Sequence, residues 1–235
     1  FKKYLQSLSK SKKQVIFLDE LPWMSTVRSG FIQILAHLWN DYLSKEKHFI
    51  LVICGSATSW ISKKIIGDKG GFHNRISHHI HLAPFTLAET KAFLLSKKVR
   101  WVNCEIAELY MALGGIPYYL DLIKKGESAS EAIDRLCFAE GGLLKTEYSN
   151  LYKALFDQSA NHEAIVSALA KSKMGLTRLE LSKKSKVEMG GPFTRTMDDL
   201  LLSGFVVEQY PFGKIKQGTI YRLADEFSVF FHRFI

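Results

Sequence analysis

QVIFLDELPWM, residues 14–24, is the stretch of the sequence that indicates the fold. Four apolar residues, 15–18, are followed by two adjacent carboxylates, Asp19 and Glu20, and the run ends at Pro22. A short apolar run bounded by strand breakers is typical of a strand buried on both faces of a parallel sheet. Ligands of open α/β sheets bind at the carboxyl ends of such strands. The two carboxylates therefore either bind a metal and activate water, or simply end a strand.

The composition is that of an ordinary globular protein. The chain has 235 residues, of which 47% are hydrophobic, enough for one large domain or for one medium and one small domain. No apolar run reaches the roughly 18–20 residues of a membrane span, and no signal peptide opens the chain. Three scattered cysteines, Cys54, Cys104 and Cys137, favour buried free thiols in the cytoplasm. The net charge of +9 favours acidic partners such as nucleic acid or nucleotides.

The first 100 residues carry alternating strand and helix patterns. An amphipathic helix beginning at Phe1 is expected before the first strand, and a helical spacing in residues 29–47 precedes a second apolar run, HFILVICGS (48–56). A further helical stretch is followed by a third, short strand expected in HNRISHHIHLAPF (73–85). Strands and helices that alternate at these lengths favour parallel pairing. We therefore predict a parallel-sheet α/β core over residues 1–100.

The pattern then becomes helical. TLAETKAFLLSKK (86–98) opens with Thr86 and Glu89 at the spacing of a capping box, and further helices are expected near residues 103–113, 117–125 and 128–138. We predict a helical, lid-like region over residues 101–158.

Residues 159–235 are expected to form a winged helix-turn-helix domain. Three helical patterns occupy residues 161–173, 176–187 and 192–204, the second opened by Thr177 and the third ended by Gly204. Two strands follow, FVVEQYPF (205–212) and TIYRLAD (219–225), joined by a loop with Gly and Lys. Three short helices followed by a β-hairpin is the plan of a winged helix.

Asp19 and Glu20 have the arrangement that phosphoryl transfer requires. In such sites the first carboxylate after a strand holds Mg²⁺, usually through water, and its neighbour orients or deprotonates the attacking water. The second strand ends in Ser56 and Thr58, which would lie beside this pair if the two strands are neighbours. A hydroxyl there could bind the attacking water or the γ-phosphate, although a serine in this place is also a common helix N-cap.

Two further segments have both a functional and a structural interpretation. Arg75, just before the expected third strand, could meet the charge of a γ-phosphate or form a surface salt bridge. LGGIPYYL (113–120) places Gly114 and Gly115 before Pro117 at a helix start. Glycines there allow close approach of the backbone to a ligand, or simply make a sharp turn.

Four histidines raise the question of a metal site. His79 and His81 would share one face of a strand, but no cysteine or acidic residue is close to His73, His78, His79 or His81 in the sequence. Alternation on a sheet edge is the plainer interpretation, and we expect no metal there.

This succession of motifs resembles the STAND-type branch of AAA-like P-loop ATPases, the archaeal-type ATPases. VIFLDEL matches its Walker B strand, LVICGSATSWI its sensor-1 strand and helix, FHNRISHHIHLAPFTLAE its arginine segment, and LGGIPYYL its adenine-side turn. HEAIVSALA and YRLADEFSVFF resemble parts of the winged helix that follows the ATPase core in that family. The resemblance extends over nearly the whole chain and implies a partial P-loop core in residues 1–100.

The resemblance also implies a role for each site residue. Asp19 would bind Mg²⁺, Glu20 would be the catalytic base, Ser56 the sensor and Arg75 the phosphate-facing arginine. The nucleotide-binding turn would be formed by Gly114, Gly115 and Pro117, with ATP and Mg²⁺ as the cofactors. Family members often carry Gly directly before the arginine, whereas this chain has Asn74.

One motif of the family is absent from the 235 residues. No G-x-x-x-x-G-K-[ST] occurs, so these residues supply neither a nest of backbone N–H groups nor a lysine for the β- and γ-phosphates. In the family this loop precedes Walker B, so we expect it before Phe1. The chain starts without Met and ends in an aromatic segment, which favours a fragment that does not hydrolyse ATP alone.

The second and third helices of the expected winged helix carry the candidate nucleic-acid contacts. Between Lys171 and Arg195 there are seven Lys or Arg and two Glu, a local excess that could contact phosphates. Asp198 and Asp199 on the same helix oppose this, and many winged helices bind protein instead. The candidate contacts are Lys183, Lys184, Lys186, Thr194 and Arg195.

Three hypotheses follow. In the first, the chain is part of an ATPase whose winged helix couples nucleotide state to a DNA or protein partner, with an oligomer as an open alternative. In the second, it is a nucleic-acid-binding regulator with the α/β part as a scaffold. In the third, it is a degenerate ATPase kept as an interaction module.

Overall fold

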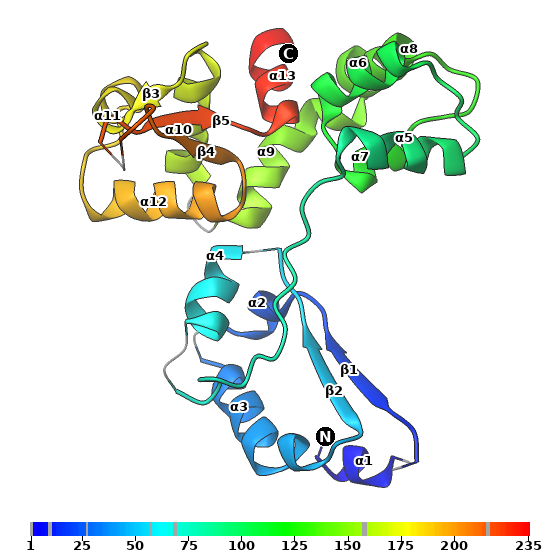
Figure 1. Ribbon diagram of the computed structural model, residues 1–235, viewed down its shortest axis with the longest axis vertical. Helices are drawn as coiled ribbons and strands as arrows, with labels where there is room; N and C mark the ends of the chain where they lie inside the picture. The colour runs from blue at the N-terminus through cyan, green and yellow to red at the C-terminus, as the bar shows by residue number, and fades with distance from the viewer. Residues whose placement is uncertain are drawn as a thin grey trace. The chain divides into compact units, whose positions relative to one another are not determined.

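A computed structural model describes residues 2–8, 11–26, 28–56, 58–67, 70–156, 159–214 and 217–235. The side chains of Ser59 and Ser149 and the expected helix residue Phe1 lie outside this description. The chain divides into two compact units, Phe1–Ile80 and His81–Ile235 (Figure 1).

The described residues of the first unit contain a parallel pair of strands. β1 (Gln14–Leu18) pairs with β2 (Phe49–Ile53) in the register Gln14↔Phe49 to Leu18↔Ile53. The helix α3 (Phe31–Asp41) connects the two strands, as the sequence predicted. The other elements of the unit are α1 (Lys2–Ser7), α2 (Leu21–Met24), a 3₁₀ turn (Leu43–Lys45), α4 (Thr58–Ile61) and a π-helical turn (Ser62–Ile66).

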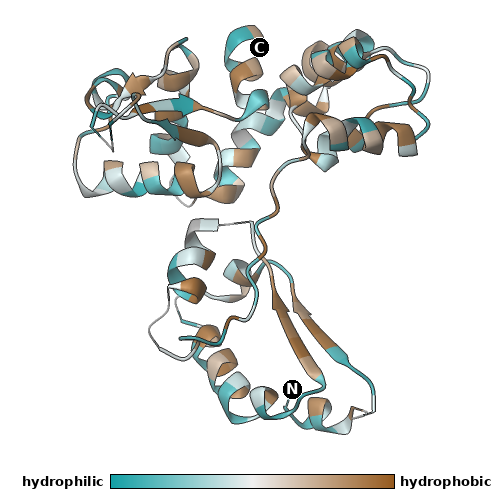
Figure 2. Cartoon of the chain, in the orientation of Figure 1, coloured by the Kyte–Doolittle hydropathy of each residue, from teal (hydrophilic) through white to brown (hydrophobic). Residues whose placement is uncertain are grey.

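The prediction that the strands are buried on both faces is wrong within the described part of this unit. Val15 and Phe17 are 62% and 58% exposed, whereas Ile16 and Leu51 pack against buried residues of the unit. Figure 2 shows both strands as mostly apolar. The apolar run forms a strand as expected, but the described helices of this unit bury only one of its faces.

The prediction of a third strand is also wrong. Residues 76–86 form neither helix nor strand, and the next element after the π-helical turn is α5 (Leu87–Ser96). A strand requires that its backbone groups pair with a neighbour, and no described strand pairs with this segment. The alternation of apolar and polar residues was therefore a misleading signal, and the four histidines do not lie on a sheet edge.

The second unit begins with a bundle of helices. The prediction of a capping box is confirmed at α5, where Glu89 N–H donates to Thr86 Oγ1 at 3.3 Å and Thr86 N–H donates to Glu89 Oε2 at 2.8 Å. The helices that follow are α6 (Asn103–Leu113), α7 (Pro117–Asp121), α8 (Ala129–Ile133) with a π-helical turn (Asp134–Phe138), and α9 (Leu143–Leu155). The sequence pattern missed α9.

The rest of this unit has the predicted order of three helices and a hairpin. The helices are α10 (Ser159–Ala170), α11 (Arg178–Ser185) and α12 (Gly191–Leu202), followed by β4 (Val206–Gln209), β5 (Ile220–Leu223) and a last helix, α13 (Glu226–Phe234). A short strand, β3 (Leu176–Thr177), adds to the hairpin, so that the described antiparallel sheet has the order β3-β5-β4.

One hydrophobic core extends through the second unit, from α5 to α13. Tyr152 of α9 is fully buried, and its hydroxyl lies 2.9 Å from Ser228 Oγ of α13. Phe227, also fully buried, contacts the ring of Tyr119 in α7 at a centroid distance of 5.2 Å. The last helix therefore ties the early helices of the unit to the later helices and sheet.

Candidate functional site

The carboxyl ends of β1 and β2 bring two carboxylates and a hydroxyl together. Backbone hydrogen bonds continue past the strand ends, from Cys54 N–H to Leu18 O at 2.9 Å and from Leu21 N–H to Cys54 O at 3.0 Å. Glu20 Oε1 accepts the Ser56 N–H at 3.0 Å, and Glu20 Oε2 accepts the Ser56 hydroxyl at 3.1 Å. The structure thus places Ser56 against Glu20, the proximity on which the sequence argument depended.

Glu20 has an unusual backbone conformation. Its φ of 48° and ψ of 52° lie in the left-handed region, which costs a residue with a side chain about 1–3 kcal/mol. The next residue, Leu21, is fully buried and begins α2. The conformation turns the chain so that Leu21 enters the core while the carboxylate of Glu20 reaches Ser56. Backbone strain of this kind is concentrated at functional sites.

Gly55 allows α2 to lie close to the end of β2. A Cβ atom at Gly55 would stand 2.8 Å from Pro22 Cδ and 3.3 Å from Ile61 Cδ1, which is closer than carbon atoms pack. A larger residue would therefore displace Pro22, and with it the segment that carries Glu20. Gly55 thus supports the distance between Glu20 and Ser56.

Asp19 accepts a hydrogen bond from a thiol. Cys54 Sγ lies 2.8 Å from Asp19 Oδ1, and this contact raises the pKa of Cys54, so the thiol stays protonated and donates. Asp19 is exposed, and its Oδ2 forms no hydrogen bond or ion pair with the described residues. One oxygen of this carboxylate is therefore held by the protein and the other is open.

This donor set fits a magnesium ion that is shared with a nucleotide. Carboxylate oxygens suit Mg²⁺, which proteins usually hold through one or two carboxylates together with waters and substrate phosphates. Within the described ranges no cluster of three or more His, Cys, Asp or Glu side chains could hold a metal alone. Asp19, whose Oδ2 has no described hydrogen-bond partner, matches the pattern of a single carboxylate ligand.

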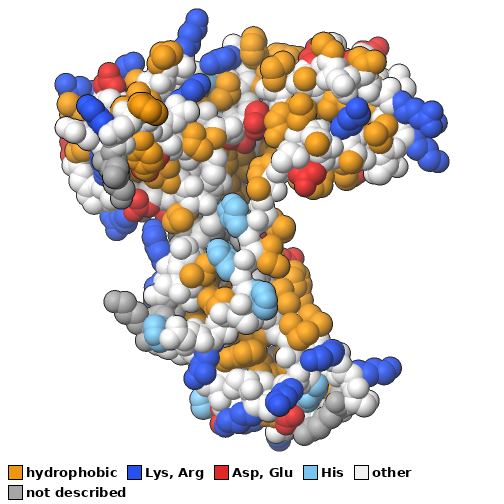
Figure 3. Space-filling view, viewed as in Figure 1, with side chains coloured by type: hydrophobic (Ala, Val, Ile, Leu, Met, Phe, Trp, Pro, Cys, Tyr) orange, Lys and Arg blue, Asp and Glu red, His pale blue; other side chains and the backbone are white. Residues whose placement is uncertain are grey.

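The structure does not connect Arg75 to this site. Its side chain is exposed and forms no hydrogen bond or ion pair with the described residues, while its N–H donates to Phe72 O at 3.0 Å. Asn74 has a φ of 55°, a left-handed conformation that glycine and asparagine adopt at least cost. Asn74 therefore preserves the backbone geometry that a glycine would provide. Figure 3 shows several histidine side chains at the surface.

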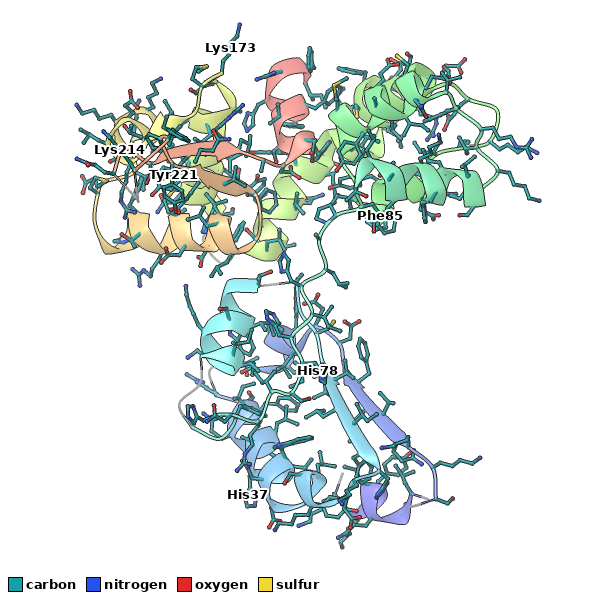
Figure 4. All side chains as sticks on the ribbon, in the orientation of Figure 1. His37, His78, Phe85, Lys173, Lys214 and Tyr221 are labelled. Carbon is teal, nitrogen blue, oxygen red and sulfur yellow. The ribbon has the colours of Figure 1, made fainter. Side chains whose placement is uncertain are left out.

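The Gly-Gly-x-Pro turn belongs to the second unit. A Cβ atom at Gly115 would lie 1.9 Å from Phe85 O, and Phe85 N–H donates to Gly115 O at 2.8 Å. Figure 4 labels Phe85 on the chain. Gly114 has a φ of 67°, and Pro117 begins α7. The close approach that Gly115 permits is therefore to the backbone of Phe85, which explains this glycine structurally.

The candidate nucleic-acid contacts lie on α11, at its C-cap residue Lys186, and on α12. Lys183, Lys184 and Lys186 are exposed, and so is Arg195. Thr194 differs, because its hydroxyl donates to Gly190 O at 2.9 Å and accepts from Arg178 Nη2 at 2.6 Å. The hydroxyl of Thr194 is thus part of the domain's own hydrogen bonding.

Sequence reasoning missed Cys54 and Phe85. A sequence signal for Cys54 was available. Cys54 directly follows β2 and Asp19 directly follows β1. The last residues of these strands, Leu18 and Ile53, pair with each other. No sequence signal linked Phe85 to Gly115, because the two residues meet only through the tertiary fold.

Comparisons with known proteins agree with this architecture. The model of the family described as "ATPase domain predominantly from Archaea" matches residues 1–123. An uncharacterized protein of Methanocaldococcus jannaschii, MJECL04, is 25% identical over 227 residues, which are 95% of this chain and 49% of that protein. The chain thus spans about half the length of this curated relative.

A solved structure shares the fold. The Walker-type ATPase PABY2304 of Pyrococcus abyssi superposes with a TM-score of 0.66 at 18% identity, covering 94% of this chain and 63% of that one. No helix in the described ranges is long and apolar enough to cross a membrane. Because the family model matches more than half of the 235 residues, the chain belongs to the family of ATPase domains found predominantly in Archaea.

Proposed function

We propose that the chain is part of a Mg²⁺-dependent P-loop ATPase of the STAND type, with the edge formed by Asp19, Glu20 and Ser56 as its hydrolytic site. The observation that carries the proposal is the contact between Glu20 and Ser56 at the carboxyl ends of two parallel strands. Such an edge is where open α/β folds bind their ligands. The family membership and the shared fold support a P-loop ATPase as the class.

The residues of the edge divide the tasks of hydrolysis among them. Asp19 would hold Mg²⁺ with its carboxylate, one oxygen of which has no described hydrogen-bond partner. The ion, when bound, neutralises charge on the β- and γ-phosphates. Glu20 orients the attacking water and accepts its proton, since each carboxylate oxygen has two lone pairs and the contacts with Ser56 leave acceptor capacity. Ser56 fixes the direction of the Glu20 carboxylate and acts as the sensor of the γ-phosphate.

The remaining predicted residues have supporting roles. Arg75, exposed and without a described ion-pair partner, supplies positive charge to the γ-phosphate. The family resemblance assigns adenine contacts to the turn of Gly114, Gly115 and Pro117, and this role is part of the proposal. The 235 residues contain no G-x-x-x-x-G-K-[ST] loop to bind the phosphates, so in this proposal they do not hydrolyse ATP alone.

We further propose that α10, α11 and α12 with the β3-β5-β4 sheet form a winged helix that couples nucleotide state to a partner. The order of three helices and a hairpin supports this assignment. The division into a core (1–100), a lid-like region (101–158) and a winged helix (159–235) belongs to the same proposal. Because α9, α10 and α13 share one hydrophobic core, a movement of the lid-like region would be transmitted to the winged helix.

The decisive test is Glu20→Gln in the full-length natural protein that contains these residues. Loss of the proton acceptor is expected to lower kcat for ATP hydrolysis about 1,000-fold, with ATP affinity within about threefold of wild type. Glu140→Gln changes an exposed carboxylate of the second unit and is the matched control. Unchanged turnover in the Glu20→Gln variant would refute the role of Glu20.

A second candidate function is nucleic-acid binding by the winged helix. The observation that favours it is the exposure of Lys183, Lys184, Lys186 and Arg195 on two successive helices. Affinity for labelled duplex DNA would then fall steeply with salt, and Lys183→Ala with Lys184→Ala would reduce the salt slope by about 2. Absent or salt-insensitive binding would exclude this function and leave a protein partner for the winged helix.

A further inference from the structure

Cys54 lies directly across the sheet edge from Asp19. Its N–H donates to Leu18 O and its carbonyl accepts from Leu21 N–H, at 2.9 and 3.0 Å. These two bonds hold Cys54 against the backbone on both sides of Asp19. The pairing of β1 with β2 therefore places the Cys54 backbone beside Asp19, within reach of its carboxylate.

The contact between the two side chains has a defined polarity. Cys54 Sγ is 2.8 Å from Asp19 Oδ1. An ionised carboxylate only accepts hydrogen bonds, so the thiol is the donor. A thiol is a weak, neutral donor, and it fixes the carboxylate without cancelling the negative charge that a cation needs. A lysine or arginine in the same place would compete with the metal.

We infer that Cys54 is a positioning residue for metal binding: its thiol holds Asp19 Oδ1 and leaves Asp19 Oδ2 directed to Mg²⁺. The inference rests on the proposed function, which gives Asp19 its metal. Mg²⁺ demands near-ideal octahedral geometry, so the direction of the ligand oxygen matters for its affinity. Hydrogen-bond partners behind a metal ligand typically change metal affinity about 10–100-fold.

The test measures metal binding directly. Mn²⁺, which replaces Mg²⁺ and is visible by electron paramagnetic resonance, is titrated into the full-length natural protein with ADP. Cys54→Ala, which removes the donor, is expected to weaken Mn²⁺ binding about 10-fold. Cys54→Ser keeps a donor and is expected to stay within about threefold of wild type. Cys104→Ala changes an exposed cysteine of the second unit and is the matched control.

Two further measurements separate positioning from simple packing. ADP affinity without metal and the thermal midpoint are expected to match wild type in Cys54→Ala. Cys54→Val fills the volume without a donor and replaces Cys54→Ala if the latter does not fold. A folded donor-free variant with wild-type Mn²⁺ affinity overturns the inference, and so does equal weakening in Cys54→Ser and Cys54→Ala.

A variant of the metal ligand distinguishes this inference from the proposed function. Asp19→Ala is expected to abolish Mn²⁺ binding. If it does so while Cys54→Ala has no effect, the inference about Cys54 fails and the metal site stands. If Asp19→Ala leaves Mn²⁺ binding intact, the proposed metal site itself is wrong.

Discussion

Two regions that the sequence assigned to one nucleotide site are built on different principles. At the carboxyl ends of β1 and β2, polar side chains contact one another, Glu20 with Ser56 and Asp19 with Cys54. At the Gly-Gly-x-Pro turn, backbone packs on backbone, and Gly115 makes room for Phe85. The first region depends on hydrogen-bond donors and acceptors. The second depends on the absence of a side chain, so a substitution there should act on stability.

The largest expected effect on stability comes from Gly115→Ala. The new methyl group would lie 1.9 Å from Phe85 O, and backbone cannot rotate away as a side chain can. We expect the free energy of unfolding of the second unit to fall by about 3 kcal/mol, measured by urea denaturation. Gly191→Ala, where no atom stands within 4 Å, is the control and should be nearly neutral. Equal stability of the two variants would contradict the packing role of Gly115.

Gly55→Ala should have a smaller effect, because it meets a side chain and not backbone. The Cβ atom would contact Pro22 Cδ at 2.8 Å, so we expect a loss of about 1–2 kcal/mol in the first unit. The same substitution in a Pro22→Ala background should cost less, since the clashing atom is gone. A double-mutant cycle of urea denaturation curves measures this coupling, and additive effects would exclude the clash as the cause.

Ser56→Ala tests only the region at the carboxyl ends of β1 and β2. It removes the hydroxyl that contacts Glu20 Oε2 and keeps the backbone N–H that contacts Oε1. Loss of one hydrogen bond to a carboxylate is expected to lower kcat about tenfold in the full-length natural protein, less than the change expected for Glu20→Gln. The neighbouring Thr58→Ala, whose hydroxyl donates to Ser56 O at 3.4 Å and not to Glu20 among the described contacts, is the control. A similar loss in both variants would argue against a specific role of Ser56.

The smallest expected effect is a pH dependence at the start of α5. Hydrogen bonds from the Thr86 N–H and hydroxyl lower the pKa of Glu89. A carboxyl group whose pKa is lower in the folded state stabilises the fold above its unfolded pKa of about 4.3. This contribution is lost as pH falls through the lowered value. The difference in the free energy of unfolding between wild type and Glu89→Gln, measured by urea denaturation, should therefore shrink as the pH falls from 5 to about 2–3. A difference that stays constant over this range would show that the Glu89 carboxylate does not stabilise the fold.

Local patterns predicted much of the fold. The apolar runs around Phe17 and Leu51 form the paired strands, and the Thr86 and Glu89 spacing forms its capping box. Periodicity and cap chemistry act within a few residues, so one sequence suffices to detect them. The exposed face of Phe17 and the unpaired segment after Arg75 were beyond such patterns, since burial and strand pairing depend on which distant elements are present.

The site was predictable to a similar extent. The proximity of Ser56 to Glu20 followed from two strands expected to be neighbours. The thiol contact of Asp19 and the close packing at Gly115 required three-dimensional placement. The side-chain position of Arg75 likewise depends on tertiary contacts, which a motif does not specify.

The common core of the second unit also has a thermodynamic consequence. Tyr148 stacks on Phe231 at 4.3 Å and its hydroxyl contacts His232 Nε2 at 2.7 Å, while Tyr152 contacts Ser228. Through these contacts α9 and α13 cannot separate without exposing both halves of the core, so this unit should melt as a single cooperative transition. Any ligand that binds one half of the unit should therefore also stabilise the other half against unfolding.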